Sequence, residues 1–529
     1  MNPFFITTAI DYTNGAPHIG HAYEKVLADV LARFHRQAGE EVFFLTGVDQ
    51  HGQKVQQSAE REGIAPQEYV DGITGKFLSL WEKLGIGFDG WAATTAERHK
   101  ACVQAILTRL REDRDPATGE SRWIYKAARA GHYSVRQEQF LTDKERGPDG
   151  EFGPEWGQVE YREEENYYFR LSAHRQWLLD LIDARGSAGK PLVLPSFRVA
   201  ELRNAVEKLE GDLCISRPKS RLSWGIEFPF DPGFVTYVWF DALVNYLSFA
   251  PGYDPVPERP SGEFLRLWST VIHDIGKDIL IPAHGVYWPV MLKALGFSDD
   301  EMPTLLVHGW WNISGAKMSK SLGNTVDPSA LADRYGAAAL RYYLMSDIAT
   351  GRDADFSEER LIQRHNVDLA NGLGNLVNRT LNMTLKYRGG SPVCADLPGD
   401  LASHLAGNTE ALSRYAASMG EGQVQAALEQ LSDVVVRSNA LVDSSAPWKL
   451  AKDPEQAARL DAVLATLILS ARAAATMLLP VLPDAAAEIL RQLNLSASFE
   501  GDARGLPSGY RCGEPKPVFP RLEMPVVEA

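Results

Sequence analysis

Two short segments of this chain carry side chains suited to phosphate chemistry, and the first lies near the N-terminus. His18 and His21 stand three residues apart in the segment Pro17–His21. A helix beginning there would place both imidazoles on one side of its first turn, beside free backbone N–H groups and a partial positive charge. Gly20 would let a nucleotide approach the backbone. The alternatives are two helix-capping histidines or a zinc pair, although zinc needs further ligands and no suitable cluster lies nearby.

The second segment, Gly315–Asn324, holds two ammonium groups, Lys317 and Lys320, among small residues. Reaction at a phosphate passes through a highly anionic transition state, which needs positioning and cationic stabilisation more than a covalent nucleophile. A loop rich in Gly and Ser can close on such a transition state and reopen. The alternative is a solvated basic turn.

In this order, and each at a predicted strand–helix junction, the two segments resemble the ATP signatures of class I aminoacyl-tRNA synthetases. Further segments narrow the resemblance to the methionyl-tRNA synthetase family, and it covers nearly the whole chain. It implies that an amino acid is activated as its adenylate and passed to tRNA. The catalytic residues it implies are His18, His21, Lys317 and Lys320. The ATP contacts it implies are Tyr12, Gly20, Gly276, Asp278, Trp311 and Lys320.

An aromatic segment, Tyr237–Tyr246, supplies the features expected of a methionine pocket. A thioether is apolar and polarizable and gains from sulfur–aromatic contact, and a Tyr hydroxyl or His N–H can reach its sulfur. By resemblance, Asp49 meets the substrate ammonium. The full set implied by the resemblance is Ala9, Ile10, Tyr12, Asp49, Trp239, Ala242, Leu243, Tyr246, Ile279 and His284. The alternative for these aromatic residues is an ordinary core.

The spacing of the signatures bears on which amino acid is chosen. Discrimination by size is limited to roughly 10–200-fold per methylene, so the leucyl, isoleucyl and valyl relatives carry a large editing insertion. The chain has no room for one. A cysteinyl enzyme, which would need a zinc–thiolate site, and a non-catalytic tRNA-binding paralogue stay open as competing interpretations.

Three residues of the C-terminal part are candidates for reading an anticodon. Asn375 and Arg379 lie one turn apart on one helix face, and Trp448 follows Pro447 at a predicted helix start. Unstacked loop bases are commonly recognised by aromatic stacking plus hydrogen bonds. By resemblance, this trio reads the CAU anticodon, and the partner is tRNA(Met), including the initiator. The alternative for Trp448 is an apolar staple at the helix start.

Composition indicates which partners and which cellular compartment fit these sites. The 529 residues carry a net charge of −15, which favours a selective RNA contact over general polyanion binding. The four cysteines are scattered without a Cys-x-x-Cys pair, which favours a reducing cytoplasm and no zinc. Mg²⁺ should arrive with ATP. No secretory signal or membrane span is expected. Lacking an additional C-terminal domain that dimerises some relatives, the chain is expected to be a monomer.

Several elements must position these residues. Residues 4–8 and 41–45 read as buried strands around a helix from His21, which is a βαβ unit of a parallel sheet. Residues 124–138 and 159–171 read as hairpin strands, and the α/β pattern resumes in residues 235–240, 277–282 and 304–307. Beyond Asp327 the pattern is helical to about Leu493, and the last thirty or so residues are expected to wrap over the helices.

The predicted fold is α/β: a Rossmann-like parallel-sheet catalytic domain split by a connective insertion, followed by an all-α anticodon-binding bundle. The expected division is catalytic 1–111, insertion 112–229, catalytic 230–325, stem-contact segment 326–360, and helical domain with tail 361–529.

Overall fold

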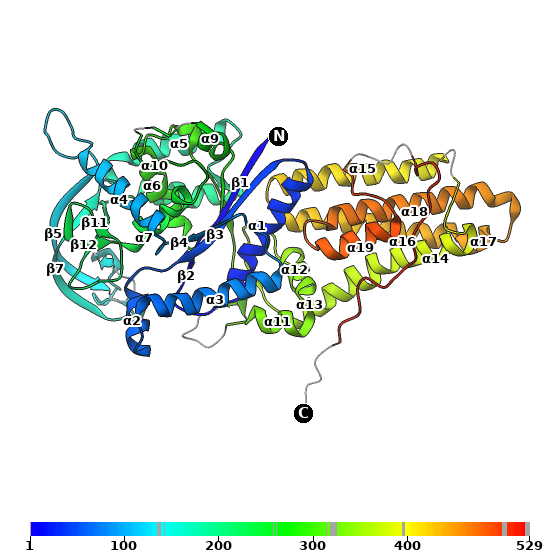
Figure 1. Cartoon of the computed structure of the whole chain (residues 1–529), viewed down its shortest axis with the longest axis horizontal. Coiled ribbons are helices and arrows are strands. Elements are labelled where there is room, and N and C mark those ends of the chain that lie inside the picture. Colours follow the sequence, from blue (N-terminus) through cyan, green and yellow to red (C-terminus); the bar gives the residue numbers. More distant parts are fainter. Residues whose placement is uncertain are drawn as a thin grey trace, which may run out of the picture.

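A computed structural model describes most of the chain and shows an elongated molecule with a sheet-containing part at one end and a helical bundle at the other (Figure 1). The described residues are 2–134, 139–141, 143–257, 259–260, 262–313, 315–317, 325–393, 397–499 and 505–523. Lys320, predicted to be catalytic, and the side chain of Lys317 lie outside this description.

The central element is a seven-stranded parallel sheet in the order β2-β3-β1-β13-β14-β8, with β4 pairing β3. Its strands are β1 Pro3–Thr8, β2 Asp11–Tyr12, β3 Glu41–Asp49, β4 Gly90–Ala93, β8 Val193–Leu194, β13 Ile272–Gly276 and β14 Thr304–His308. The predicted parallel sheet is confirmed. Because the strands are parallel, the carboxyl ends of β1, β3, β13 and β14 meet at one edge, where ligands of such sheets bind.

Helices cover the sheet. Their bounds are α1 Ile19–Gln37, α2 Gln53–Glu62, α3 Pro66–Leu84, α4 Glu97–Glu112, α5 Arg175–Ser187, α6 Val199–Glu207, α7 Val238–Leu243, α8 Asn245–Ser248, α9 Gly262–Trp268 and α10 Trp288–Ala294. Helix α1 is buried along nearly its whole length, and it lies between the sheet and the bundle (Figure 1). That burial accounts for its long apolar run, and it fixes the position of the paired histidines at its start.

A group of antiparallel strands interrupts the parallel sheet in sequence. One sheet has the order β6-β5-β7-β9, and all eleven residues of β5 pair with β7, which confirms the predicted hairpin. A second sheet has the order β10-β12-β11. The bounds are β5 Ile124–Ser134, β6 Gln139–Leu141, β7 Val159–Phe169, β9 Leu213–Cys214, β10 Ser216–Pro218, β11 Glu227–Phe228 and β12 Asp231–Thr236. Between these strands the chain returns once to the parallel sheet as β8.

Two segments expected to resume the α/β pattern differ in detail. Residues 235–240 are divided between the end of β12, which is antiparallel, and the start of α7. Residues 277–282 follow the strand instead of forming it: β13 ends at Gly276, and the apolar residues beyond it enter a π-helix, η5 Leu280–Tyr287. A short apolar run fits a buried strand or a buried helix equally well, so its pattern could not decide between them.

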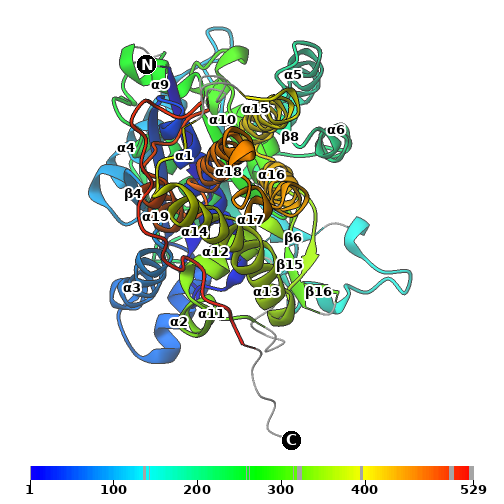
Figure 2. The ribbon, with the colours of Figure 1, turned by 90° about the vertical axis from the view of Figure 1, so that its right-hand side faces the viewer.

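Beyond Asp327 the chain is mainly helical to Leu493, as predicted, although the short strand β17 (Ala354–Asp355) lies among the helices. Its helices are α11 Pro328–Tyr335, α12 Ala337–Ser346, α13 Glu358–Arg364, the π-helix η8 His365–Gly374, α14 Asn375–Arg388, α15 Gly399–Gly420, α16 Val424–Ser445, α17 Pro447–Leu450, α18 Ala457–Leu478 and α19 Pro483–Leu493. Figure 2 shows α14, α16 and α18 side by side in the bundle. The tail 505–523 crosses the surface of the helical bundle. There the Cys512 backbone N–H donates to the Gly390 carbonyl (2.9 Å), and Phe519 packs beside Gly374.

One described helical segment, Pro454–Leu478, is long and apolar enough to cross a membrane, yet 89% of its most apolar window is buried inside the protein. It contains α18, which packs against α14, α15, α16 and α19. Its composition is therefore explained by its central place in the bundle.

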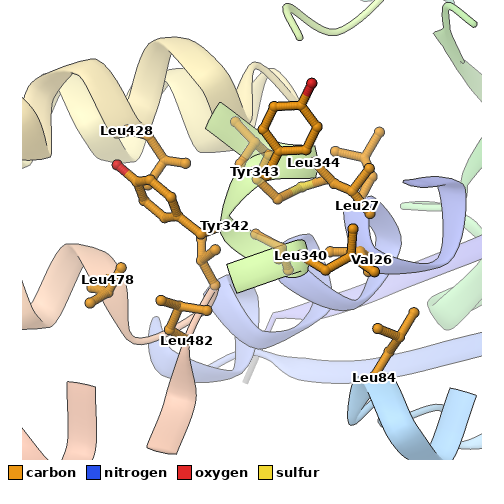
Figure 3. Packing of buried hydrophobic residues seen from close by; sticks show 14 of the residues in the cluster. Val26, Leu27, Leu84, Leu340, Tyr342, Tyr343, Leu344, Leu428, Leu478 and Leu482 are labelled. Carbon is orange, nitrogen blue, oxygen red and sulfur yellow. The ribbon is translucent and has the colours of Figure 1, made fainter. Parts of the chain in front are cut away.

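The two ends of the molecule share one hydrophobic core. Figure 3 shows Val26 and Leu27 of α1 packed with Leu340 and Leu344 of α12, which lies between the sheet part and the bundle. Within this core the Arg341 guanidinium is almost fully buried and donates to Asp29 of α1 (2.7 Å), to the carbonyl of Leu84 (3.1 Å) and to that of Val481 (2.9 Å).

Candidate active site and nucleic-acid interface

A cavity of about 420 Å³ opens at the carboxyl edge of the parallel sheet. It gathers residues from the loop after β1, from β2, β3, β13 and β14, from the start of α1 and from α7 and α8. Every predicted ATP- or methionine-contacting residue whose side chain is described borders it: Ala9, Ile10, Tyr12, His18, Gly20, His21, Asp49, Trp239, Ala242, Leu243, Tyr246, Gly276, Asp278, Ile279, His284 and Trp311. Residues up to 302 positions apart in the sequence are thus brought to one cavity.

The two histidines cap their own helix reciprocally. His18 is the N-cap of α1, and its Nδ1 accepts from the Gly20 N–H (3.1 Å), while His21 Nδ1 accepts from the His18 N–H (3.1 Å). The rings stack with centroids 3.8 Å apart. Because each Nδ1 accepts, each neutral ring carries its proton on Nε2, the nitrogen that can donate to an anion. The capping interpretation and the phosphate-binding interpretation are therefore compatible.

A buried charge network underlies the part of the cavity beside α1. Lys25 of α1 donates to Asp11 (2.8 Å), Glu24 (2.7 Å) and the carbonyl of Ala9 (2.9 Å). His308, at the end of β14, pairs with Glu24 at 3.0 Å. Burial alone would lower the pKa of His308, but the hydrogen bond to Glu24 raises it to about 9, so the imidazole is cationic at neutral pH. The network holds α1 against β1, β2 and β14.

Tyr246 and His284 form the polar part of the other end of the cavity. The His284 Nδ1 lies 3.0 Å from the Ile279 carbonyl, so this nitrogen carries the proton and donates, and Nε2 accepts from the Tyr246 hydroxyl at 2.7 Å. Burial lowers the pKa of His284 to about 4, which keeps the ring neutral. In this structure both donors expected to reach a sulfur atom are already paired with protein acceptors. The surrounding surface is aromatic and aliphatic.

Asp49 lies at the end of β3 and is almost fully buried. Thr13 donates its N–H and its hydroxyl to the Asp49 carbonyl (both 2.9 Å), which fixes the backbone. Two residues further on, His51 pairs with Asp241 of α7 at 2.7 Å, and Asp241 also pairs with His99 of α4 at 2.7 Å. This buried bridge joins the Asp49 loop to the helix that carries Trp239 and Ala242.

Gly276 and Asp278 lie at the end of β13. A Cβ at Gly276 would stand only 2.8 Å from Asp278 Oδ1, so glycine is needed for the carboxylate to fold back over the strand end. Trp311 borders the cavity, but it is only 2% exposed and packs among Tyr23 and Tyr343.

The anticodon candidates lie in the bundle, away from the cavity, and all three reach solvent. Asn375 is exposed at the first turn of α14, and Trp448 is 39% exposed on α17. Arg379 pairs with Asp443 at 2.8 Å, near the end of α16, five residues before Trp448. The structure therefore places Asn375 and Arg379 on one helix face and links that face to the segment that leads into Trp448.

Among the residues that the structure describes, no group of three or more His, Cys, Asp or Glu side chains is arranged to hold a metal ion.

Several residues of the cavity were missed from the sequence, and Glu24, His308 and Trp310 are the ones that bear on its electrostatics and hydrogen bonding. Glu24 and Lys25 had a signal, because these two charged residues stand between Ala22, Tyr23, Val26 and Leu27 in an apolar stretch of the helix, and charges are seldom buried unless paired. His308 and Trp310 carry no comparable pattern, since only the packing of β14 beside α1 brings them to the cavity.

Comparisons with known proteins agree with this arrangement. A family model described as "tRNA synthetases class I (M)" matches residues 4–149 and 156–381, and one described as "Anticodon binding domain of methionyl tRNA ligase" matches residues 396–522. The fold is thus that of a class I aminoacyl-tRNA synthetase.

Individual relatives show which family of class I aminoacyl-tRNA synthetases the chain belongs to. The methionine–tRNA ligase of Deinococcus radiodurans is 40% identical over 98% of this chain and 74% of its own length, and that of Rhizobium meliloti is 39% identical over 99% of each. Mycobacterium tuberculosis methionyl-tRNA synthetase in complex with methionyl-adenylate superposes with a TM-score of 0.88 at 35% identity, covering 98% of this chain and 100% of that one. The chain belongs to the methionine–tRNA ligase family.

Proposed function

We propose that this protein activates methionine with ATP to methionyl-adenylate and pyrophosphate, and then transfers the methionyl group to the 3′ end of tRNA(Met), including the initiator. The observation that carries the proposal is the convergence of the paired histidines, Asp49, Asp278 and His284 on one cavity at the sheet edge. That cavity has a hydrogen-bond-donating side at the start of α1 and an aromatic side, as a triphosphate and a thioether would require.

Activation is attack of the methionine carboxylate on the α-phosphate of ATP. Positioning and electrostatic stabilisation of the leaving pyrophosphate are the main tasks of the protein in such a step. His18 and His21 would donate through Nε2 from the start of α1, whose helix end adds a partial positive charge. Lys317 and Lys320 would supply cations. Tyr12, Gly20, Gly276, Asp278 and Trp311 would line the nucleotide site, with Gly276 and Asp278 at the ribose.

Methionine would lie at the opposite end of the same cavity. Its ammonium would meet Asp49, and its side chain would lie against the aromatic and aliphatic surface formed with Tyr246 and His284. The remaining contacts would come from Ala9, Ile10, Tyr12, Trp239, Ala242, Leu243 and Ile279. The neutral state of His284 suits an apolar side chain, because a charged imidazole would hold water in the pocket.

We propose that Mg²⁺ enters with the phosphates of ATP and that no zinc is needed. The acidic residues of the cavity floor support this: Asp11 and Glu24 are already engaged by Lys25 and His308, so they fit a charge-balanced floor better than a resident metal site.

Asn375, Arg379 and Trp448 would read the anticodon, because they are accessible together on the bundle far along the molecule from the cavity. We further propose a cytoplasmic monomer divided into catalytic residues 1–111 and 230–325, a connective insertion 112–229, a stem-contact segment 326–360, and a helical anticodon-binding domain with its tail, 361–529.

One experiment tests the proposal. Pyrophosphate exchange into ATP should depend on methionine and be near background with cysteine, leucine, isoleucine or valine, and a tRNA(Met) transcript should then be charged. Exchange driven by cysteine would favour the cysteinyl alternative, and tRNA binding without any exchange would favour the non-catalytic paralogue.

A further inference from the structure

Trp310 lies beside the carboxylate expected to hold the ribose. Its indole N–H donates to Asp278 Oδ1 at 3.1 Å, and the Lys277 ammonium lies 4.0 Å from the centre of its ring. The indole borders the same cavity as Asp278. A tryptophan N–H can only donate, so this contact favours the ionised, correctly turned carboxylate over other rotamers.

The indole is itself held from a distant part of the chain. The Trp310 backbone N–H donates to Asp353 Oδ1 (2.9 Å), and Lys277 donates to Asp353 Oδ2 (2.5 Å). The preceding residue, Gly309, approaches the chain so closely that a Cβ there would stand 1.8 Å from the Arg352 carbonyl oxygen. Asp353 therefore fixes both the backbone of Trp310 and the Lys277 ammonium above the indole ring.

This arrangement is not a generic surface contact. The four groups come from three segments of the chain, 277–278, 310 and 353. Trp310, Asp353 and Lys277 close a ring of interactions, and the Trp310 indole N–H extends from this ring to the Asp278 carboxylate. Two of the contacts are hydrogen bonds to charged oxygens that fix the indole at its N–H and at its backbone. A side chain held at both ends has little rotamer freedom left to lose when a ligand binds.

We propose that Trp310, held by Lys277 and Asp353, is a positioning residue that fixes the Asp278 carboxylate for the nucleotide ribose. The inference rests on the proposed function, since it takes Asp278 as the ribose contact. Trp310 also immediately precedes β15 (Trp311–Ile313), which pairs with β16 (Ala316–Lys317) and with β17 (Ala354–Asp355). The same tryptophan thus connects the ribose contact to the hairpin that leads into the lysine segment.

Trp310→Phe tests the proposal, because phenylalanine keeps an aromatic ring beneath Lys277 but has no N–H. We expect the KM for ATP in methionine-dependent pyrophosphate exchange to rise roughly 10-fold, since a hydrogen bond to a charged group is lost. The KM for methionine should stay within about twofold, a split that a general loss of structure would not produce.

Trp177 offers a matched control. Its indole N–H donates to Asp299 at 3.0 Å and the Lys293 ammonium lies 4.3 Å from its ring centre, but it borders no part of the cavity. Trp177→Phe removes the same kind of hydrogen bond and should leave both KM values unchanged. Asp353→Asn is a second, shape-conserving variant, and it should raise the KM for ATP in the same direction as Trp310→Phe.

A double variant distinguishes the possible failures. If Trp310 acts through Asp278, Trp310→Phe should add nothing to the loss caused by Asp278→Asn. Additive losses would overturn the inference, and so would an unchanged KM for ATP in both Trp310→Phe and Asp353→Asn while Asp278→Asn is impaired. An unimpaired Asp278→Asn would instead overturn the ribose role in the proposed function, and the inference with it.

Discussion

At the scale of single residues, the proposed function gives His18 and His21 two tasks each, and these use different ring nitrogens. The Nδ1 atoms satisfy backbone N–H groups at the start of α1, and the Nε2 atoms remain as the donors. Replacement of either ring therefore removes a helix cap as well as a phosphate-binding group. The two losses differ greatly in size, which makes them separable by experiment.

His21→Ala should lower methionine-dependent pyrophosphate exchange by roughly 10²–10³, the usual cost of one donor to a transition state. The lost cap should cost only about 1 kcal/mol of unfolding free energy. Ser298→Ala, which breaks the other reciprocal cap formed with Glu301, should match the stability loss without the loss of rate. Exchange near the wild-type rate in His21→Ala would remove His21 from the catalytic residues. The same 10²–10³ loss is expected for Lys320→Ala.

His284 should make stability depend on pH. Its folded-state pKa of about 4 lies below the ordinary 6.5, so between these values the unfolded chain binds a proton that the folded chain does not. Stability is therefore full above about pH 6.5 and falls as the pH drops toward 4, by up to about 3 kcal/mol. Urea unfolding from pH 7 to 4 should show a shallower decline for His284→Gln than for the wild type. Parallel curves would contradict this.

At the scale of elements, the sequence predicted secondary structure best where an apolar pattern was long, and it predicted site residues best where a motif was specific to one family. Helix α1 and the helices beyond Asp327 follow from sustained apolar patterns, and the hairpin β5–β7 follows from the change to a charged, hairpin-like sequence. The run Val235–Phe240 did not reveal its break between β12 and α7, because the break depends on Tyr237 donating to Ile215 (2.8 Å), a contact from outside the run. Likewise Trp310 and His308 needed the packed structure, whereas Asp49 and His284 were found through their motifs.

The antiparallel insertion should fold without zinc. The structure gives its stability other sources: the full pairing of β5 with β7 and a buried bridge in which Ser216 donates to Asn166 (2.9 Å) and accepts from the Tyr167 N–H (2.8 Å). Treatment with a chelator, followed by return of Mg²⁺, should leave the melting temperature and the activity unchanged. Elemental analysis showing about one tightly held zinc per chain would refute the prediction.

Helix α17 should serve tRNA and not activation. Trp448→Ala should lose base stacking worth roughly 1–3 kcal/mol, so charging of tRNA falls about 5- to 150-fold while pyrophosphate exchange is unchanged. Asn375→Ala and Arg379→Ala should behave alike, with the loss concentrated on anticodon identity. Val436→Ala is a control, since Val436 is another exposed apolar residue of the bundle, at 63%. Unfolding of the bundle, or an equal fall in both activities, would show Trp448 to be structural.

At the scale of the whole molecule, the sheet part and the bundle are joined through α12 by a continuous core and not by a loose linker (Figure 3). Under the proposed function, a tRNA meets the cavity with one end and α14 with the other, which requires these two parts to keep a fixed spacing. Arg341 is the polar centre of the junction, because it joins α12 to α1, α3 and the segment after α18.

Arg341→Gln should therefore affect both stability and the reach between the two ends. Removing one partner of a buried ion pair costs about 3–5 kcal/mol, and Asp29 keeps Arg33 (2.7 Å) and the Gly87 N–H (2.9 Å), so we expect the lower end of that range. Arg33→Gln removes the more exposed partner of the same carboxylate and should cost about 1 kcal/mol or less. Urea unfolding measures both stability losses.

Because the junction sets the spacing, Arg341→Gln should also raise the KM for tRNA while methionine-dependent exchange at low temperature stays near the wild-type rate. Equal stability losses in the two variants, or exchange falling in step with charging, would show that Arg341 does not hold the two parts in register.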